Sequence, residues 1–204
     1  MSIRSVVPDN IGWLEYDLSK DELDYVWKCI NNKEQQSITS TLAGNISSSF
    51  ALKDTNDWFF TNCITKLLNA YGENFKNLGA DIPNNNAHPY YMNSWWVNFQ
   101  KQHEFNPLHD HFGVYSFVIF MKIPVDFEKQ NEGYDNNNPM KSAFQFCYTN
   151  IMGEIKTEEY HLSPEDEGPM LFFPSGLHHQ VYPFYNCDQE RITVSGNISI
   201  NTNL

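Results

Sequence analysis

Three histidines and one arginine are the side chains whose types and spacing fit metal and anion chemistry. His109 and His111 lie in NPLHDHFGVYSF, His179 in FFPSGLHHQVYPF and Arg191 in ERITVSGN. Side chains alternate across an extended strand, so histidines two residues apart point to the same side and can meet one ion. His179, 68 positions after His111, can supply a third imidazole if the fold brings its strand alongside.

Three imidazoles predict a transition-metal site without naming the metal, because several first-row metals, zinc among them, accept this ligand. His178 competes with His179, but strand alternation lets only one of them face the ion. The carboxylate of Asp110 would point to the opposite face of a regular strand from His109 and His111, an inference that a bulge would overturn. The predicted ligands are His109, His111 and His179, with His178 as the alternative to His179.

The other histidines fit no such site. His103 and Glu104 resemble the start of a zinc-protease helix, but HEFNP lacks the second histidine and contains Pro107. His88 and His161 stand alone, and we expect surface or hydrogen-bonded core roles for both.

Composition limits the classes of function. A length of 204 residues predicts one domain with a substantial core, and 15% aromatic residues favour a β-rich one. A formal charge of −12 without a basic cluster argues against nucleic-acid binding. No apolar stretch is long enough for a membrane span or an export signal, and the four dispersed cysteines fit a reducing cytoplasm, that of the host cell if the protein is viral.

Two regions differ in pattern within the single domain of residues 1–204. Residues 1–88 read as a helical support region, with helices over DELDYVWKCINN and over Thr55–Lys76, the second after a capping Asp54. Residues 89–204 read as the β core that carries the metal site. Its predicted strands are YYMNSWWVNF, GVYSFVIFMKIP, SAFQFCYT, EEYHL, PMLFFP, HQVYPFY and RITVSGNISI. This order predicts a mainly β sandwich or barrel buttressed by helices on one face.

The segment Glu128–Lys141 is polar and Asn-rich and joins two predicted core strands. Loops of this kind are mobile and often functional. We expect it to border the mouth of the active site and to order when substrate binds.

The last predicted strand has one polar face and one apolar face. Arg191, Thr193, Ser195, Asn197 and Ser199 alternate with apolar residues and Gly196. Taken alone, the polar face reads equally well as a solvated outer surface. If the apolar face packs beneath the helices, the polar face lines the interior, where Arg191 needs an anionic partner because an unpaired buried guanidinium is costly.

These segments resemble the iron(II)- and 2-oxoglutarate-dependent oxygenases, in particular small prolyl-hydroxylase-like members common in phages and marine bacteria. The resemblance covers about residues 94–200. It rests on SWWVNFQKQHEFNPLHDHFGVYSFVIFMKIP, EGPMLFFPSGLHHQVYPF and ERITVSGNIS, which occur in the family's order and at similar spacing. It implies a double-stranded β-helix, the cupin-like jelly roll, with N-terminal helices supporting the larger sheet.

The resemblance also implies roles for single residues. His109 matches the first iron ligand, and His111 stands where most of the superfamily has a carboxylate, although this subgroup often shows H-x-H. His179 matches the distal ligand. Arg191 matches the residue that binds the distal carboxylate of 2-oxoglutarate, and Thr193 occupies the position of an assisting hydroxyl residue.

Asn98, on the strand before the first histidine, is expected to contact the cosubstrate. The implied enzyme is a dioxygenase that binds Fe(II) and 2-oxoglutarate, consumes dioxygen, forms succinate and hydroxylates a peptide or protein side chain, with proline the first choice. Three neutral ligands would leave more charge on iron than two histidines and a carboxylate do.

Two other functions fit the same residues. A cupin-like enzyme could use the three histidines without 2-oxoglutarate, with Arg191 binding a substrate anion instead. A metal-stabilised structural domain, such as a phage accessory protein, would bind metal without turnover. Metal-dependent succinate formation separates these alternatives from the oxygenase.

Overall fold

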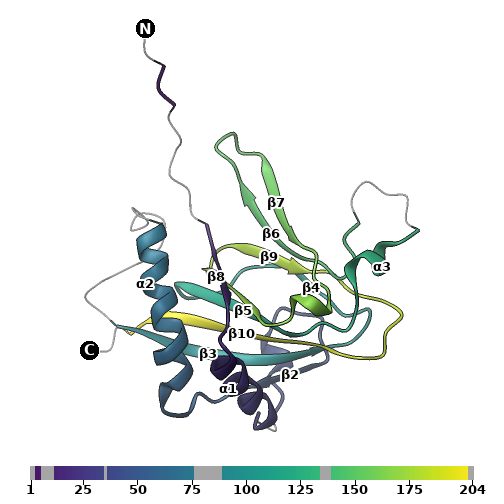
Figure 1. Ribbon diagram of the computed structural model, residues 1–204, viewed down its shortest axis with the longest axis horizontal. Helices are drawn as coiled ribbons and strands as arrows, with labels where there is room; N and C mark the ends of the chain where they lie inside the picture. Colours follow the sequence, from purple (N-terminus) through teal and green to yellow (C-terminus); the bar gives the residue numbers. More distant parts are fainter. Residues whose placement is uncertain (1–2, 6–11, 35, 76–88, 134–138, 202–204) are drawn as a thin grey trace.

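The computed structural model describes residues 3–5, 12–34, 36–75, 89–133 and 139–201. The described strands form two antiparallel sheets, a large sheet in the order β1-β8-β5-β10-β3-β2 and a small sheet in the order β4-β9-β6-β7 (Figure 1). The strands are β1 (Leu14–Asp17), β2 (Ser48–Ala51), β3 (Tyr90–Gln100), β4 (Asn106–His109), β5 (Tyr115–Lys122), β6 (Phe144–Thr149), β7 (Ile155–Tyr160), β8 (Pro169–Pro174), β9 (His178–Val181) and β10 (Arg191–Ile200). The predicted jelly roll supported by helices is confirmed.

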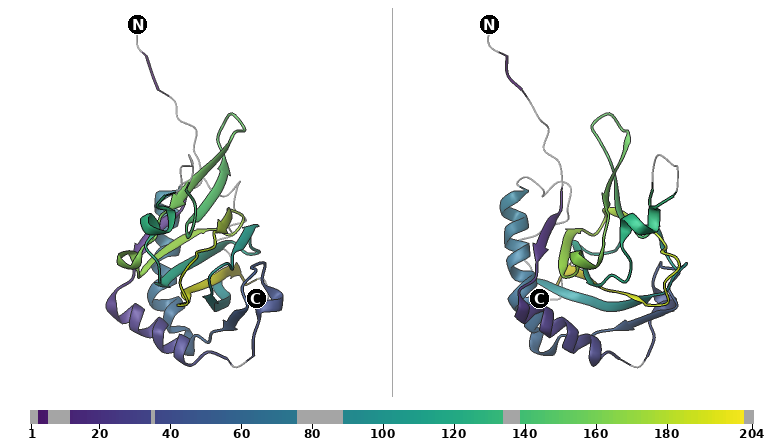
Figure 2. Two further views of the ribbon diagram at one scale, coloured as in Figure 1. Left: turned by 90° about the vertical axis from the view of Figure 1, so that its right-hand side faces the viewer. Right: turned by 45° about the vertical axis from the view of Figure 1, so that its right-hand side comes forward.

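The large sheet is covered on both faces, and this explains why β5 reads as a continuous apolar run. Helices α1 (Lys20–Asn31) and α2 (Thr65–Asn74) lie on one side of this sheet, and the small sheet lies on the other (Figure 2). Ile119, which is fully buried, packs with the helices, whereas its neighbours Val118 and Phe120 pack with Phe144 of the small sheet. The core therefore has two layers, one on each side of the large sheet.

Helix α1 (Lys20–Asn31) begins at a capping box in which Ser19 and Glu22 satisfy each other's backbone N–H groups. Its buried side, which includes Val26 and Ile30, packs on the large sheet. The apolar spacing in DELDYVWKCINN predicted this helix.

The second predicted helix forms in several pieces. Asp54 makes no capping bond to the residues directly after it, but its carboxylate accepts hydrogen bonds from the backbone N–H groups of Phe59 and Phe60, at 3.0 and 2.9 Å. Asn56 and Asp57 have φ values of 56° and 51°, so the regular helix starts only after them. A π-helix (Phe60–Ile64) then leads into α2 (Thr65–Asn74). Lys76, the predicted end, lies outside the described residues, as does His88.

The N-terminal region, residues 1–88, contributes strands to the large sheet as well as the helices expected of it. Its short strands β1 and β2 form the two edges of the large sheet, with Leu14 opposite Phe172 and Ser49 opposite Asn98. Four-residue strands carry little periodic signal, because they are defined by pairing with distant strands. None of the described helices is long and apolar enough to cross a membrane.

Part of the predicted loop Glu128–Lys141 is helical. Helix α3 (Phe127–Asn131) begins at Asp126, whose side chain accepts a hydrogen bond from the backbone N–H of Lys129 at 3.0 Å. The expectation of a loop was therefore wrong for these residues. Residues 134–138 lie outside the part of the chain that the structure describes.

Candidate metal centre and anion site

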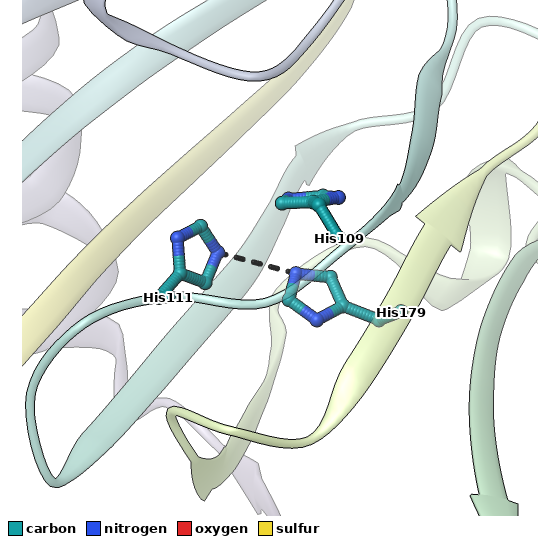
Figure 3. A group of neighbouring side chains, drawn as sticks. All are labelled: His109, His111 and His179. Carbon is teal, nitrogen blue, oxygen red and sulfur yellow. Dashed lines mark hydrogen bonds between the residues drawn. The ribbon is translucent and has the colours of Figure 1, made fainter.

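The three predicted histidines converge at one point between the sheets (Figure 3). One ring nitrogen from each of His109, His111 and His179 lies within 4.8 Å of the other two. His109 ends β4 and pairs directly with His179 on β9, whereas His111 follows two residues later, outside the strand. An irregularity in the β4 register, between Asn106 and His109, sets this pairing.

Backbone carbonyls orient two of the rings. His109 Nδ1 lies 2.7 Å from the carbonyl oxygen of Pro107, and His179 Nδ1 lies 2.9 Å from that of Leu177. A carbonyl only accepts, so each Nδ1 donates and the lone pair of the neutral ring lies on Nε2. The Nε2 atoms of His111 and His179 are 3.2 Å apart. A cation could replace the proton between them.

Burial keeps these imidazoles neutral. It lowers the pKa of His179 to about 3 and that of His111 to about 4, and it also lowers the pKa of His109. The neighbouring histidines add to the effect on His111 and His179, because a second positive charge in the cluster would be repelled. Neutral rings with free lone pairs are the form that binds a metal ion.

Among the described residues, these three histidines form the one group of His, Cys, Asp or Glu placed to hold a metal ion. His178 is exposed whereas His179 is 5% exposed, so strand alternation turns only His179 into the interior. Asp110 is exposed and does not belong to the group, despite the irregularity in β4. His103 and His161 lie elsewhere on the surface.

Arg191 lies inside the fold without a carboxylate partner among the described residues. It is 1% exposed, and its guanidinium donates to the carbonyl oxygen of Ser142 at 2.7 Å and to Gln100 Oε1 at 3.5 Å. The ring of Phe184 lies 5.3 Å from its guanidinium carbon, and its Nε has no hydrogen-bond partner. Burial lowers the pKa of Arg191 to about 10, so it keeps its charge at neutral pH.

Asn98 and Thr193 line the same cavity as this guanidinium. The Asn98 amide donates to Thr193 Oγ1 at 3.5 Å, and its carbonyl oxygen accepts from Ser49 Oγ at 2.7 Å. The contacts of Arg191 with Gln100 and Ser142 were not predicted. Gln100 could have been found, because it lies two residues after Asn98 and shares its face of β3. The Ser142 contact is made through a backbone carbonyl and has no sequence signal.

All six predicted site residues line one cavity of about 490 Å³. Its walls are the inner faces of β3, β5 and β10, the small sheet and the segment 38–46, which packs across one side. The polar face of β10 therefore points inward and its apolar face packs with the helices, which excludes the solvated alternative. Of the predicted loop Glu128–Lys141, the residues that the structure describes do not line the cavity; residues 134–138, on which the expectation also depends, lie outside the described part.

The cavity suits a small dianion bound next to a metal ion. The three neutral imidazoles offer nitrogen ligands, and the buried guanidinium offers charge with an unpaired Nε. Both groups face the same space. The residues present therefore fit Fe(II) and a dicarboxylic acid.

Solved structures share this fold at low sequence identity. A prolyl-4-hydroxylase from Pseudomonas putida matches with a TM-score of 0.52 and 15% identity, over 91% of each chain. A prolyl hydroxylase from Trichoplax adhaerens, solved with a peptide fragment of a hypoxia-inducible factor oxygen degradation domain, matches with a TM-score of 0.53 and 11% identity, over 93% of this chain and 83% of the other.

No curated protein matches the chain in sequence. A family model described as 2OG-Fe(II) oxygenase matches residues 94–197, which is half of the chain and includes every residue of the histidine cluster and the anion site. This match favours the oxygenase over the alternatives without 2-oxoglutarate or without turnover. The chain therefore belongs to the 2OG-Fe(II) oxygenase family and is an oxygenase that uses Fe(II) and 2-oxoglutarate.

Proposed function

We propose that His109, His111 and His179 hold Fe(II), that Arg191 binds the distal carboxylate of 2-oxoglutarate, and that the enzyme hydroxylates a peptide or protein side chain, with proline the first candidate. One observation carries this proposal. A buried guanidinium without a described carboxylate partner shares a cavity with three neutral, converging imidazoles.

The histidines hold the metal in a fixed orientation. The carbonyls of Pro107 and Leu177 keep the protons of His109 and His179 on Nδ1, so both rings present Nε2 without rearrangement. Because all three ligands are neutral, the metal keeps its full charge. That charge strengthens its attraction for an anionic 2-oxo acid.

Arg191 fixes the other end of the cosubstrate. A guanidinium matches a carboxylate with two parallel N–H donors, and Nε, which has no partner, can be one of them. Thr193 Oγ1 and the Asn98 amide line the same cavity and would complete the site. The bound anion would also offset the cost of burying the charge of Arg191.

Fe(II) with 2-oxoglutarate would supply dioxygen activation for hydroxylating a C–H bond, with the 2-oxo acid converted to succinate and carbon dioxide. The chain binds the cosubstrate between Arg191 and the histidines, and its apolar walls exclude water. Phe120, Phe144 and Phe173 form these walls. The similarity of fold to two prolyl hydroxylases supports a peptide substrate and proline as the target.

An anaerobic titration tests the metal and cosubstrate sites together. Addition of 2-oxoglutarate to the Fe(II) protein should produce a visible charge-transfer band. His179→Ala should abolish Fe(II) binding measured by calorimetry, whereas His178→Ala, the matched control one residue away, should leave it unchanged. Equal loss in both variants would contradict the assignment of the third ligand.

Succinate formation tests the reaction. Purified protein with Fe(II), 2-oxoglutarate, dioxygen and proline-containing peptides should release succinate and add 16 mass units to a peptide. Succinate release without any change in mass of the peptides would retain the oxygenase and reject the peptide substrate. Arg191→Ala should abolish 2-oxoglutarate binding and spare Fe(II) binding.

A further inference from the structure

The cavity has two ends that differ in exposure. Arg191 and Asn197 lie six residues apart on the inner face of β10, about 20 Å at the usual rise of a strand. The histidine cluster lies between these two ends. Ser195, which lies between Arg191 and Asn197 on β10, pairs with Trp96, and the Trp96 ring lies 5.9 Å from the His111 ring. A cosubstrate held between Arg191 and the metal leaves the Asn197 end unused.

The Arg191 end is closed, since this residue is 1% exposed and is covered by Ser142 and Phe184. At the other end, Asn93 and Ser94 are exposed and also line the cavity. The second end is therefore part of the mouth, and a substrate can enter there without displacing the cosubstrate.

A β-bulge turns an additional side chain into this mouth. Asn197 pairs with Ser94 and Ile198 pairs with Met92, so Asn93 has no partner on β10. Neighbouring residues on a regular strand point to opposite faces, yet Asn93 and Ser94 both line the cavity. Bulges beside active sites commonly re-aim a side chain in this way.

Hydrogen bonds hold the Asn197 carboxamide in place. Its Oδ1 accepts from Ser116 Oγ at 2.9 Å, and its Nδ2 donates to Ser94 Oγ at 3.3 Å. The hydroxyls of Ser116 and Ser175, each on a residue 1% exposed, lie 2.9 Å apart and form the base of this network. A carboxamide has two N–H donors and two lone pairs on oxygen, so Asn197 can still bond to a ligand.

The charge of this end restricts the ligand. Asn93, Ser94, Ser195 and Asn197 are uncharged, and Asp110 is the one exposed charged residue among the described residues that line the cavity. A carboxylate on the substrate would meet no cation here. Amide groups, which both donate and accept, fit the carboxamide and hydroxyl lining.

We propose that Asn93, Ser94 and Asn197 form the substrate subsite, and that Asn197 hydrogen-bonds to a backbone amide of an uncharged peptide segment whose target C–H bond lies beside the histidines. This inference rests on the proposed peptide hydroxylation. It assigns the Arg191 end of the cavity to the cosubstrate and the Asn197 end to the peptide.

The test measures binding of a defined probe to the anaerobic protein loaded with Fe(II) and 2-oxoglutarate. The probe is the uncharged peptide N-acetyl-Ala-Pro-Gly-amide, and the comparison is the same peptide with a free carboxylate. We expect calorimetry to show tighter binding of the amide form. Asn197→Leu and Ser94→Ala should each weaken it about fivefold, as loss of one neutral hydrogen bond would. Asn62→Ala, on an exposed helix surface, is the matched control and should bind like the wild type.

Affinities for Fe(II) and 2-oxoglutarate separate this role from an indirect one. The Ser175 carbonyl oxygen accepts a hydrogen bond from the backbone N–H of His111 at 2.9 Å. Asn197 could therefore act on the metal site indirectly, through the hydrogen bonds that link it to Ser116 and Ser116 to Ser175. Weaker Fe(II) or 2-oxoglutarate binding in Asn197→Leu, with unchanged probe binding, would overturn the proposal. So would a wild-type protein that binds no amide probe at about 20 mM, or that prefers the carboxylate form, while it still forms succinate. A wild-type protein that binds neither Fe(II) nor 2-oxoglutarate would instead reject the proposed function.

Discussion

Replacing Arg191 with methionine should remove 2-oxoglutarate binding at little cost in stability. Burial lowers the pKa of Arg191 from its usual 12.5 to about 10. At about 1.4 kcal/mol for each factor of ten in proton affinity, keeping this charge inside the fold costs about 3 kcal/mol. Arg191→Met has a similar length and no charge, so it relieves that cost.

The substitution also leaves the carbonyl of Ser142 without its 2.7 Å donor. An unsatisfied buried acceptor costs about 1–3 kcal/mol. The two effects oppose each other, so we expect the free energy of unfolding of the metal-free protein to stay within about 2 kcal/mol of the wild type. Urea denaturation followed by fluorescence measures this quantity.

Binding should respond much more strongly. Two charge-assisted hydrogen bonds to one carboxylate contribute about 3–6 kcal/mol together, which corresponds to about 10² to 10⁴ in the dissociation constant. Anaerobic calorimetry with 2-oxoglutarate at fixed Fe(II) should show this loss in Arg191→Met and a smaller one in Arg191→Lys, since lysine offers a point charge. A variant destabilised by about 4 kcal/mol or more, with normal 2-oxoglutarate affinity, would refute the reasoning and assign Arg191 a purely structural role.

Three further predictions concern the fold. Gly196→Ala should destabilise the protein by about 1–3 kcal/mol in urea, because a Cβ there would lie 2.5 Å from the buried ring of Phe117, and an unchanged midpoint would contradict that packing. Burial alone would raise the pKa of Glu22, but hydrogen bonds, the strongest from Lys66, lower it to about 2. Glu22→Gln should therefore lower the free energy of unfolding by about 3 kcal/mol at pH 7 and by much less near pH 2. The pKa of His179 is lowered to about 3, so below pH 6.5 the unfolded chain binds more protons than the folded one. The metal-free protein should therefore lose stability as the pH falls from 6.5 towards 3. An equal dependence of the unfolding free energy on pH in His179→Asn would exclude this cause.

The long periodic elements could be predicted from the sequence. Helix α1 and strand β10 bury residues at regular intervals, whereas β3, β5 and β8 contain continuous buried runs, and both patterns are visible in one chain. Strands β1, β2 and β4 could not be predicted in this way. Each has four residues, and each becomes a strand only by pairing with a partner far away in the sequence.

The candidate site shows the same division. Residue type and spacing were enough to select His109, His111, His179 and Arg191, because few side chains bind metals or anions and alternation limits which of them share a face. The choice between His178 and His179 depended on the phase of β9, which is set by its pairing with β4 and β6. In a strand of four residues, the sequence pattern does not show which of two neighbouring side chains points inward.

The sequence by itself determined the kind of chemistry, since the donor atoms and the charge of Arg191 are properties of residue types. The tertiary structure alone decided where that chemistry takes place. Convergence of the rings, closure of the Arg191 end by the Ser142 carbonyl and the bulge that turns Asn93 into the mouth all depend on pairing between distant strands. Such contacts involve backbone groups that every residue carries, so no residue type marks them in the sequence.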